Sequence, residues 1–184
     1  MKLFEFELGL AAKKLVNDIL RIEENEEVVI TADTMSSEEV VNATARAVFN
    51  VGAKPLVVWN ATPLGVGKAA DPMLPLKSLI GALSNADVWI EYNYQWLLYS
   101  TVFEEAFKRN KNLRHICLVG MNSDMMIRTI GRVNIPKLKE FLLEVANITM
   151  KGKKVRITTP AGTDISFNNH PARKPIVHYG YIPK

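Results

Sequence analysis

The chain has 184 residues, of which 48% are hydrophobic and 23% are charged. This composition excludes a disordered polar chain, and the length suits one domain with a sizeable core better than two full domains. The formal net charge of +4 is mild and does not by itself indicate a nucleic-acid partner. Residues 1–40 carry four basic and ten acidic side chains, whereas residues 151–184 carry seven basic and one acidic. The two ends could attract each other or face different partners, or each could be a solvated face.

A single cysteine, Cys117, excludes an intrachain disulfide and a cysteine metal cluster. It lies in an apolar run, so we expect a buried structural thiol. Glu5 and Glu7 stand where a signal peptide needs an apolar core, and no run of about 18 apolar residues could span a membrane. We therefore expect a cytoplasmic protein with no membrane partner.

The first half of the chain alternates helical and strand patterns. Apolar residues recur at helical spacing over residues 8–22, and residues 27–33 form the short, β-branched run of a strand covered on both faces. Ser36 begins a predicted helix with Glu39 at the capping-box position, and the helix stops at Gly52. Residues 54–59 are the next strand. This β-α-β order predicts parallel strands.

The same alternation continues after a loop rich in proline and glycine at residues 60–75. Four further elements are predicted in chain order: a helix over 76–84, a strand over 86–92, a helix ending near 111 and a strand over 114–119. A helix or turn then covers 124–130, and Pro136 begins a helix that ends near residue 150. Residues 1–150 are therefore expected to form an α/β domain, a Rossmann-like, open, mostly parallel sheet with helices on both faces.

Residues 151–184 follow a different pattern. Residues 154–159 and 164–167 alternate apolar and polar side chains around a turn, which predicts a C-terminal β-hairpin with one apolar face. That face needs cover, because a two-stranded hairpin alone is marginal in water. We expect the hairpin and the tail after it to dock more protein, either a second domain or another copy in a two-fold homodimer. The alternative is a monomer whose tail folds back on its own sheet.

Ligands of open α/β sheets bind beyond the carboxyl ends of the strands. The crevice candidates there are Asp33, Asn60, Tyr92 and Asn93. Asp33 could hold a ribose, a metal or a substrate amine, or it could simply open the turn into the next helix. The aromatic stretch at 92–99 could stack on a ring or form an interface, or it could be core packing.

Two other motifs fit known sites poorly. The Gly-Val-Gly-Lys loop at residues 65–68 follows a strand, but its spacing departs from that of a phosphate-binding loop, and Ala69 stands where Ser or Thr is needed. His170 and His178, with Asp164 nearby, suit zinc or ferrous iron in kind, yet their spacing matches no compact ligand motif. The residues alone therefore assign no metal ligand and no catalytic residue.

Several stretches in the last third resemble one known superfamily. They are Arg-Thr-Ile-Gly-Arg-Val at 128–133, Gly-Lys-x-Val-x-Ile-Thr at 152–158 and Ala-Gly-Thr-Asp at 161–164. With the Pro136 helix between them, they are similar to the thermophilic metalloprotease-like superfamily. That superfamily includes the aminopeptidase T (leucyl aminopeptidase) metallopeptidases and the iron-using 2,5-dihydroxypyridine dioxygenases. The resemblance covers roughly residues 8–167.

The resemblance implies an N-terminal α/β domain that leads through the hairpin into a second domain carrying the metal ligands. The Gly-Glu motif that follows the hairpin in that superfamily does not occur here, so no family ligand is carried onto a numbered residue. We therefore expect the N-terminal domain of an aminopeptidase-like metalloenzyme. Its zinc, cobalt or iron would be bound only with a second domain that this chain lacks, and this chain alone would hold no catalytic metal and be inactive. The alternatives are a domain of an iron-dependent ring-cleaving dioxygenase, or a non-catalytic module for small-ligand binding or assembly.

Overall fold

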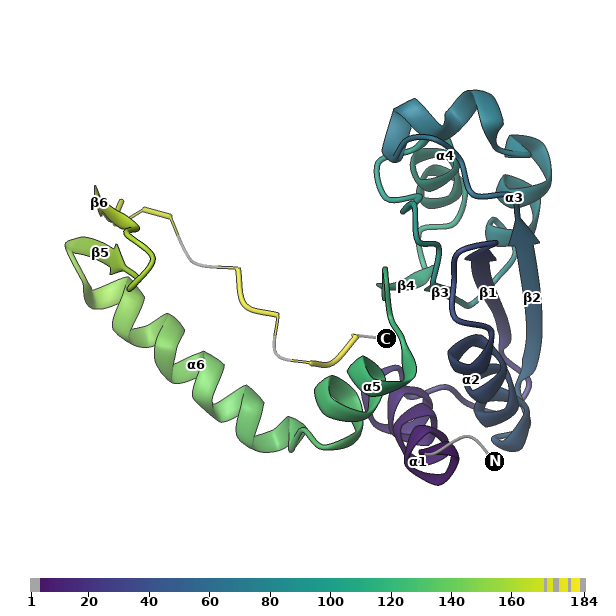
Figure 1. Cartoon of the computed structure of the whole chain (residues 1–184), viewed down its shortest axis with the longest axis horizontal. Helices are drawn as coiled ribbons and strands as arrows, with labels where there is room; N and C mark the ends of the chain where they lie inside the picture. The colour runs from purple at the N-terminus through teal and green to yellow at the C-terminus, as the bar shows by residue number, and fades with distance from the viewer. Residues whose placement is uncertain (1–3, 171, 174–175, 179, 183–184) are drawn as a thin grey trace. The chain divides into compact units, whose positions relative to one another are not determined.

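The structure is a computed structural model, which describes residues 4–170, 172–173, 176–178 and 180–182 (Figure 1). It divides into two compact units. The first consists of residues 1–132 with 182–184, and the second consists of residues 133–181. The expected boundary was at residue 150, whereas here the helix before the hairpin groups with the hairpin.

Four parallel strands form the sheet of the first unit, in the order β2-β1-β3-β4. Their bounds are β1 (Glu27–Asp33), β2 (Lys54–Asn60), β3 (Val88–Glu91) and β4 (Arg114–Cys117). All neighbouring pairs are parallel, which confirms the arrangement expected from the alternation of strands and helices. β1 lies inside the sheet and is buried at six of its seven positions, as its apolar run predicts.

Helices cover both faces of this sheet. β1 leads through α2 (Glu38–Asn50) to β2, and β2 leads through α3 (Leu76–Leu83) to β3. Since β2 and β3 lie on opposite sides of β1 and such crossovers are right-handed, α2 and α3 lie on opposite faces. The expected α/β fold is therefore confirmed.

The remaining elements of the first unit extend these two layers. α1 (Glu5–Lys14) continues into the π-helical turn η1 (Leu15–Ile19) and packs against α2. α4 (Thr101–Arg109) packs against α3. The short helices α5 (Ser123–Met126) and η3 (Ile127–Gly131) contact α1, and the 3-10 helix η2 (Gly67–Met73) contacts α4.

A buried apolar cluster fills the space between the sheet and the α3/α4 layer. Its members are Val29, Ala70, Leu74, Leu79, Ile80, Leu83, Ala86, Trp89, Leu97, Val102, Ala106 and Leu113. Val29 and Trp89 are register neighbours on β1 and β3, so their side chains point to the same face. The indole N–H of Trp89 donates to the Thr31 hydroxyl at 2.9 Å, which satisfies the one polar group that this buried ring carries.

The start of α2 differs from the sequence expectation. The helix begins at Glu38, its N-cap Ser37 makes no side-chain cap bond, and the predicted capping box at Ser36 is not formed. The Ser36 hydroxyl instead accepts from the Asp33 N–H and donates to the Tyr92 carbonyl, each at 2.9 Å. The Ser36 side chain, which the local sequence pattern assigned to the cap of α2, thus bonds to a residue 56 positions away in the sequence.

The second unit contains α6 (Ile135–Lys151) and the antiparallel hairpin of β5 (Lys154–Thr158) and β6 (Asp164–Asn168). The hairpin confirms the prediction made from the alternating pattern. Gly162 in its turn has a φ of 101°, a backbone conformation that glycine adopts readily. The side chain of Asn169 joins hairpin and helix, donating to the carbonyls of Thr149 and Gly152.

The residues after the hairpin form no helix or strand in the part that the structure describes, as the sequence indicates. Ile182, near their end, belongs to the first unit, where its N–H donates to the Ile19 carbonyl at 3.1 Å. Tyr179, one of the apolar tail residues, lies outside the described residues. None of the described helices combines the length and the apolar character needed to cross a bilayer.

Candidate functional site

The carboxyl edge of the sheet holds all four crevice candidates. Asp33 and Asn60 end β1 and β2, and Tyr92 and Asn93 follow β3 directly. Since β2 and β3 lie on opposite sides of β1, the chain reverses its direction across the sheet at this point. Such a reversal is where open α/β sheets leave room for ligands.

Asp33 joins the loops that leave β1 and β3. Its wholly buried carboxylate accepts from the Met35 N–H through Oδ1 and from the Gln95 N–H through Oδ2, both at 3.0 Å. The bond from Met35 fits the expectation that Asp33 begins the turn after β1. The bond from Gln95 also connects this turn to the loop after β3. In this conformation the carboxylate binds backbone of its own chain.

Asn60 and Asn93 form a buried amide pair across the same edge. The Asn93 side-chain N–H donates to the Asn60 side-chain oxygen at 3.0 Å, and the Asn60 amide donates to the Ala61 carbonyl. Asn93 Oδ1 is buried, and no described group donates to it. A small donor such as water is the partner that this carbonyl oxygen requires.

Tyr92 points away from the other three candidates. Its phenol lies 2.7 Å from the Thr44 hydroxyl on α2, and the whole residue is buried. Burial raises the pKa of the phenol far above its usual range. Tyr92 is therefore neutral at physiological pH and forms part of the core that supports the edge.

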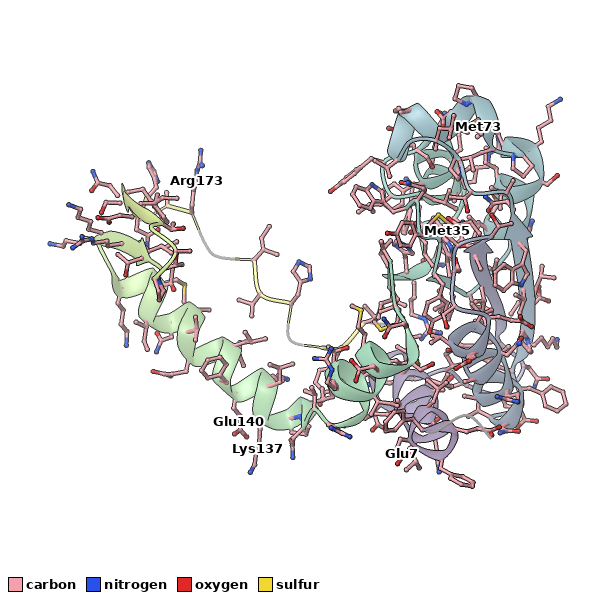
Figure 2. The ribbon with its side chains drawn as sticks, in the orientation of Figure 1. Glu7, Met35, Met73, Lys137, Glu140 and Arg173 are labelled. Atoms are coloured by element: carbon pink, nitrogen blue, oxygen red, sulfur yellow. The ribbon has the colours of Figure 1, made fainter. Side chains whose placement is uncertain are left out.

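Exposed side chains surround this buried frame. The hydroxyls of Thr34 and Thr62 lie 2.8 Å apart and connect the loops after β1 and β2. Met35 is 58% exposed beside them (Figure 2), and Tyr94 and Trp96 are 46% and 39% exposed in the loop after β3. The aromatic stretch thus divides into one core residue and a half-exposed aromatic surface.

A second polar group on the α4 side of the sheet was not identified from the sequence. The wholly buried Glu91 accepts from the Leu97 N–H with one oxygen, and its other oxygen lies 3.0 Å from His115 Nε2. The His115 ring stacks on Trp89 with centroids 4.2 Å apart. A carboxylate within an apolar strand is the signal that could have revealed this pair, because a buried charge requires a partner.

Cys117 neighbours Glu91 in the sheet register and is exposed, so the expectation of a buried thiol is wrong. β4 is the last strand of the sheet, so no described strand pairs with its outer edge. Partial burial of the sulfur, together with the negative charge of Glu91, raises the pKa of the thiol to about 12. The thiol is therefore protonated at neutral pH and is no nucleophile.

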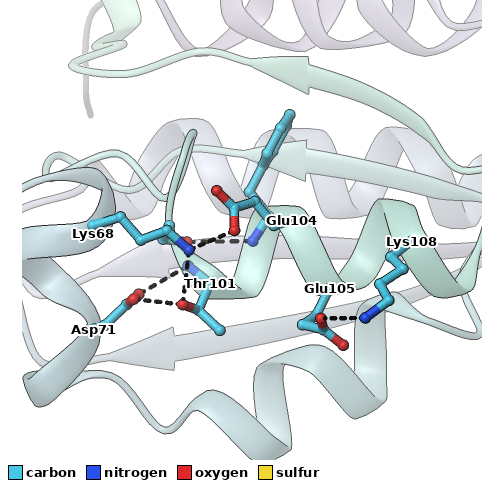
Figure 3. Close-up of polar contacts among 8 residues, drawn as sticks. Lys68, Asp71, Thr101, Glu104, Glu105 and Lys108 are labelled. Carbon is cyan, nitrogen blue, oxygen red and sulfur yellow. Dashed lines mark hydrogen bonds and ion pairs between the residues drawn. The ribbon is translucent and has the colours of Figure 1, made fainter.

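The glycine-rich loop at residues 65–68 forms no phosphate cradle. The ammonium of Lys68 lies 2.5 Å from the Glu104 carboxylate and donates to the Thr101 hydroxyl at 3.1 Å (Figure 3). Asp71 accepts both the N–H and the hydroxyl of Thr101. These contacts attach the loop to the start of α4 and give the glycines a structural role.

The metal candidates of the tail do not form a centre. The Asp164 carboxylate makes a two-pronged contact with the Arg156 guanidinium, at 2.9 and 2.8 Å. His170 Nδ1 accepts from the Ala172 N–H, and both His170 and His178 are exposed. Within the described part of the chain, no group of three or more His, Cys, Asp or Glu side chains is placed to hold a metal ion.

Comparison with known proteins gives a family match and likenesses to several solved structures. A family model described as NicX, 2,5-dihydroxypyridine 5,6-dioxygenase, matches residues 12–184. The structure of 2,5-dihydroxypyridine dioxygenase from Pseudomonas putida KT2440 is similar, with a TM-score of 0.63 and 19% identity over 96% of this chain and 51% of that chain. The structure of wild-type AmpT from Thermus thermophilus is also similar, with a TM-score of 0.52. The identity is 14%, over 90% of this chain and 54% of that chain.

No curated protein matches the chain. At these identities the two solved structures show a shared fold, and this chain spans about half the length of either.

Proposed function

Since the chain belongs to the NicX family of 2,5-dihydroxypyridine 5,6-dioxygenases, we propose that it is the α/β part of a metal-dependent enzyme that opens a dihydroxylated pyridine ring with dioxygen. The observation that carries this proposal is the family match over residues 12–184, nearly the whole chain. The dioxygenase alternative among the sequence-based expectations thereby becomes the first candidate.

The carboxyl edge supplies what such a substrate needs from this part of the enzyme. Tyr94 and Trp96 present half-exposed aromatic side chains, which suit stacking on a planar ring. Asp33 and the Asn60–Asn93 pair bind neighbouring loops and keep this surface rigid. We therefore assign substrate contact to the exposed aromatic residues and loop positioning to the buried candidates.

A metal of the iron type is implied by the family, and the described residues do not fit it. They contain no cluster of three or more suitable side chains, and Glu91 is already bonded to Leu97 and His115. We propose that the metal ligands come from polypeptide beyond these described residues. The tail histidines would then have no part in the metal centre.

An aminopeptidase is the second candidate. The Gly-Lys-x-Val-x-Ile-Thr and Ala-Gly-Thr-Asp stretches of the hairpin resemble a superfamily that includes the aminopeptidase T family, and the chain shares its fold with AmpT. Divalent metal would there activate water for attack on a peptide carbonyl. Both candidates place this α/β part beside a metal domain and differ in the chemistry of that domain.

The protein isolated from its own cells, at its natural length, distinguishes the candidates. We expect ferrous iron, air and 2,5-dihydroxypyridine to give dioxygen uptake in step with loss of the absorbance of the pyridine. Hydrolysis of leucyl p-nitroanilide with zinc or cobalt, without dioxygen uptake, would replace the first candidate by the second. A protein active in neither assay would contradict both and favour a non-catalytic binding module.

A substitution at the aromatic surface tests the assigned substrate contact. Trp96→Ala is expected to raise KM for the pyridine by roughly two- to twelvefold, since an aromatic pair contributes about 0.5–1.5 kcal/mol. Leu64→Ala is the control, because Leu64 is 91% exposed in the loop after β2. Equal KM values for the two variants would remove Trp96 from the proposed substrate surface.

The 184-residue chain alone is predicted to bind no catalytic metal and to hydrolyse no aminoacyl substrate. Metal analysis of the purified chain after dialysis measures this directly. About one equivalent of tightly held zinc, cobalt or iron, lost on His170→Ala or His178→Ala, would contradict the prediction and assign the tail histidines as ligands.

A further inference from the structure

We propose that the outer edge of β2 is a two-fold interface, at which a second copy of this chain pairs its own β2 antiparallel and continues the sheet. β2 is an edge strand of seven residues, whereas the opposite edge, β4, has four. Three large apolar side chains are exposed along or beside it: Phe49 on α2 is 70% exposed, Leu56 51% and Trp59 43%. A long, apolar, unpaired edge is a template for strand addition.

The backbone of β2 offers a self-complementary row of hydrogen-bonding groups. The Lys54 N–H donates inward to the Glu26 carbonyl, so alternate residues 54, 56, 58 and 60 bond to β1. Residues 55, 57 and 59 therefore direct their backbone groups outward. A two-fold axis makes identical strands antiparallel, and full overlap of the seven residues places Val57 opposite its own copy.

In that register the backbone forms four hydrogen bonds between the copies. The two Val57 residues exchange N–H and carbonyl bonds, and each Trp59 N–H faces the carbonyl of the other copy's Pro55. Pro55 lacks an N–H, but its nitrogen faces outward, which is where an edge strand tolerates proline. Proline at position 55 therefore removes no backbone hydrogen bond between β2 and β1.

The side chains are complementary in the same register. Pro55, Val57 and Trp59 share the face of the sheet that α2 covers. A hollow of about 440 Å³ lies there, lined by Asn42, Ala45, Arg46, Phe49, Asn50 and Pro55. Because Trp59 of one copy stands opposite Pro55 of the other, each half-exposed indole enters the other copy's hollow.

Charge and area favour a second copy as the occupant. Arg46 brings a guanidinium to the incoming indole, a favourable cation–π pair. Lys54 stands opposite Asn60 in this register, so the two β2 strands place no like charges directly opposite each other. The β2 edge is roughly 23 Å long, and the helix–sheet–helix layers beside it are together about 30 Å thick. Each copy would therefore bury roughly 700 Å² of surface, near the roughly 800 Å² per partner that is typical of stable interfaces.

Crosslinking tests the register. Two residues that exchange hydrogen bonds across antiparallel strands have Cα atoms about 5.5 Å apart, within disulfide range. Oxidation of Val57→Cys in a Cys117→Ser background is therefore expected to give a covalent dimer. Val58→Cys in the same background is the matched control and should stay uncrosslinked, because residue 58 faces residue 56 of the other copy and points to the opposite face of the sheet.

Association measured by sedimentation of the 184-residue chain tests the interface itself. Trp59→Lys removes the indole and adds a cation beside Arg46, and it should raise the dimer dissociation constant at least tenfold. Leu64→Lys, at a more exposed leucine outside the strand, should leave that constant unchanged. A chain that is monomeric at all concentrations, or a dimer that survives Trp59→Lys and does not crosslink at residue 57, would overturn the proposal.

Discussion

At the scale of single residues, the first unit depends on buried polar side chains whose partners lie far away in the sequence. Asp33, Asn93 and Glu91 have no exposed surface, and their bonds span 62, 33 and 24 residues respectively. A buried polar group that loses its partner destabilises a fold by more than the bond itself contributes, because the remaining partner stays desolvated. These side chains therefore determine the shape of the carboxyl edge.

Asp33→Asn is expected to lower the free energy of unfolding by about 1–3 kcal/mol. The new amide cannot accept at both positions, so either the Met35 or the Gln95 N–H faces another donor. Urea unfolding measures the loss. Asp124→Asn is the control, since its pair with Arg128 is exposed and should change stability by less than about 0.5 kcal/mol. If both variants lost the same free energy of unfolding, the Asp33 bonds between the loops would contribute no more to stability than an exposed ion pair.

Cys117 is predicted to be accessible but unreactive at neutral pH. With its pKa raised from 9.0 to about 12, the thiolate fraction at pH 8 falls roughly 1000-fold, and alkylation by iodoacetamide should slow accordingly. The rate should rise with pH up to about 12 and return to that of a free thiol in urea. Glu91→Gln removes the neighbouring charge and should speed the folded reaction. Rapid alkylation of the folded wild type at pH 8 would contradict this.

At the scale of elements, loop geometry rather than ligand binding explains the glycine-rich segment. Gly67 has φ of 56°, and a Cβ there would stand 3.3 Å from the Leu98 carbonyl oxygen. Its N–H donates to the Trp96 carbonyl, which fixes the loop after β2 against the loop after β3. The conformation thus links two loops at the carboxyl edge.

Gly67→Ala is expected to destabilise the protein by about 1–2 kcal/mol, since a left-handed backbone and a close contact both oppose a side chain. Gly81→Ala provides a control of opposite sign. Gly81 lies in α3 with open space at its Cβ, and alanine there should stabilise by roughly 0.5–1 kcal/mol. Thermal unfolding of the two variants measures both changes, and a neutral Gly67→Ala would remove the strain argument.

At the scale of the whole molecule, the second unit has more apolar surface than it covers. Of the 17 residues of α6, Ile135 and Ala146 alone are buried. Large exposed side chains on α6 and the hairpin are Phe141, Leu143, Val145, Ile148, Met150, Ile157, Ile165 and Phe167. We propose that further polypeptide packs on this surface, either the rest of a longer enzyme or another copy.

Removal of the tail after Asn169 tests this docking proposal. In a Trp59→Lys background, which is expected to weaken association through β2, the intact chain and the shortened chain are compared by light scattering and thermal unfolding. We expect the shortened chain to associate less. A lower melting temperature with unchanged association would instead fit a tail that folds back on its own chain, because the Ile182–Ile19 bond is lost. Monomers of equal stability would show that the tail docks nothing.

The sequence by itself determined the architecture of both units. Strands covered on both faces must be apolar throughout, and helices covered on one face must repeat every 3.6 residues. These local patterns located β1 to β4, α2, α3, α6 and the hairpin. The resemblance at residues 128–167 likewise led to the superfamily that contains the NicX family. All of these patterns lie within short stretches of the chain, so they can be recognised from the sequence alone.

The tertiary structure decided the partners of the polar residues at the carboxyl edge and beside it. No local pattern connects Ser36 to Tyr92, Asn60 to Asn93 or Glu91 to His115. Strand pairing brings these groups together, and burial then requires each to find a partner nearby. The same physics turned Tyr92 inward toward α2 and left Trp59 half-exposed on an unpaired edge. Periodicity specifies which face of an element is buried, whereas the partner of a buried polar atom depends on which elements become neighbours.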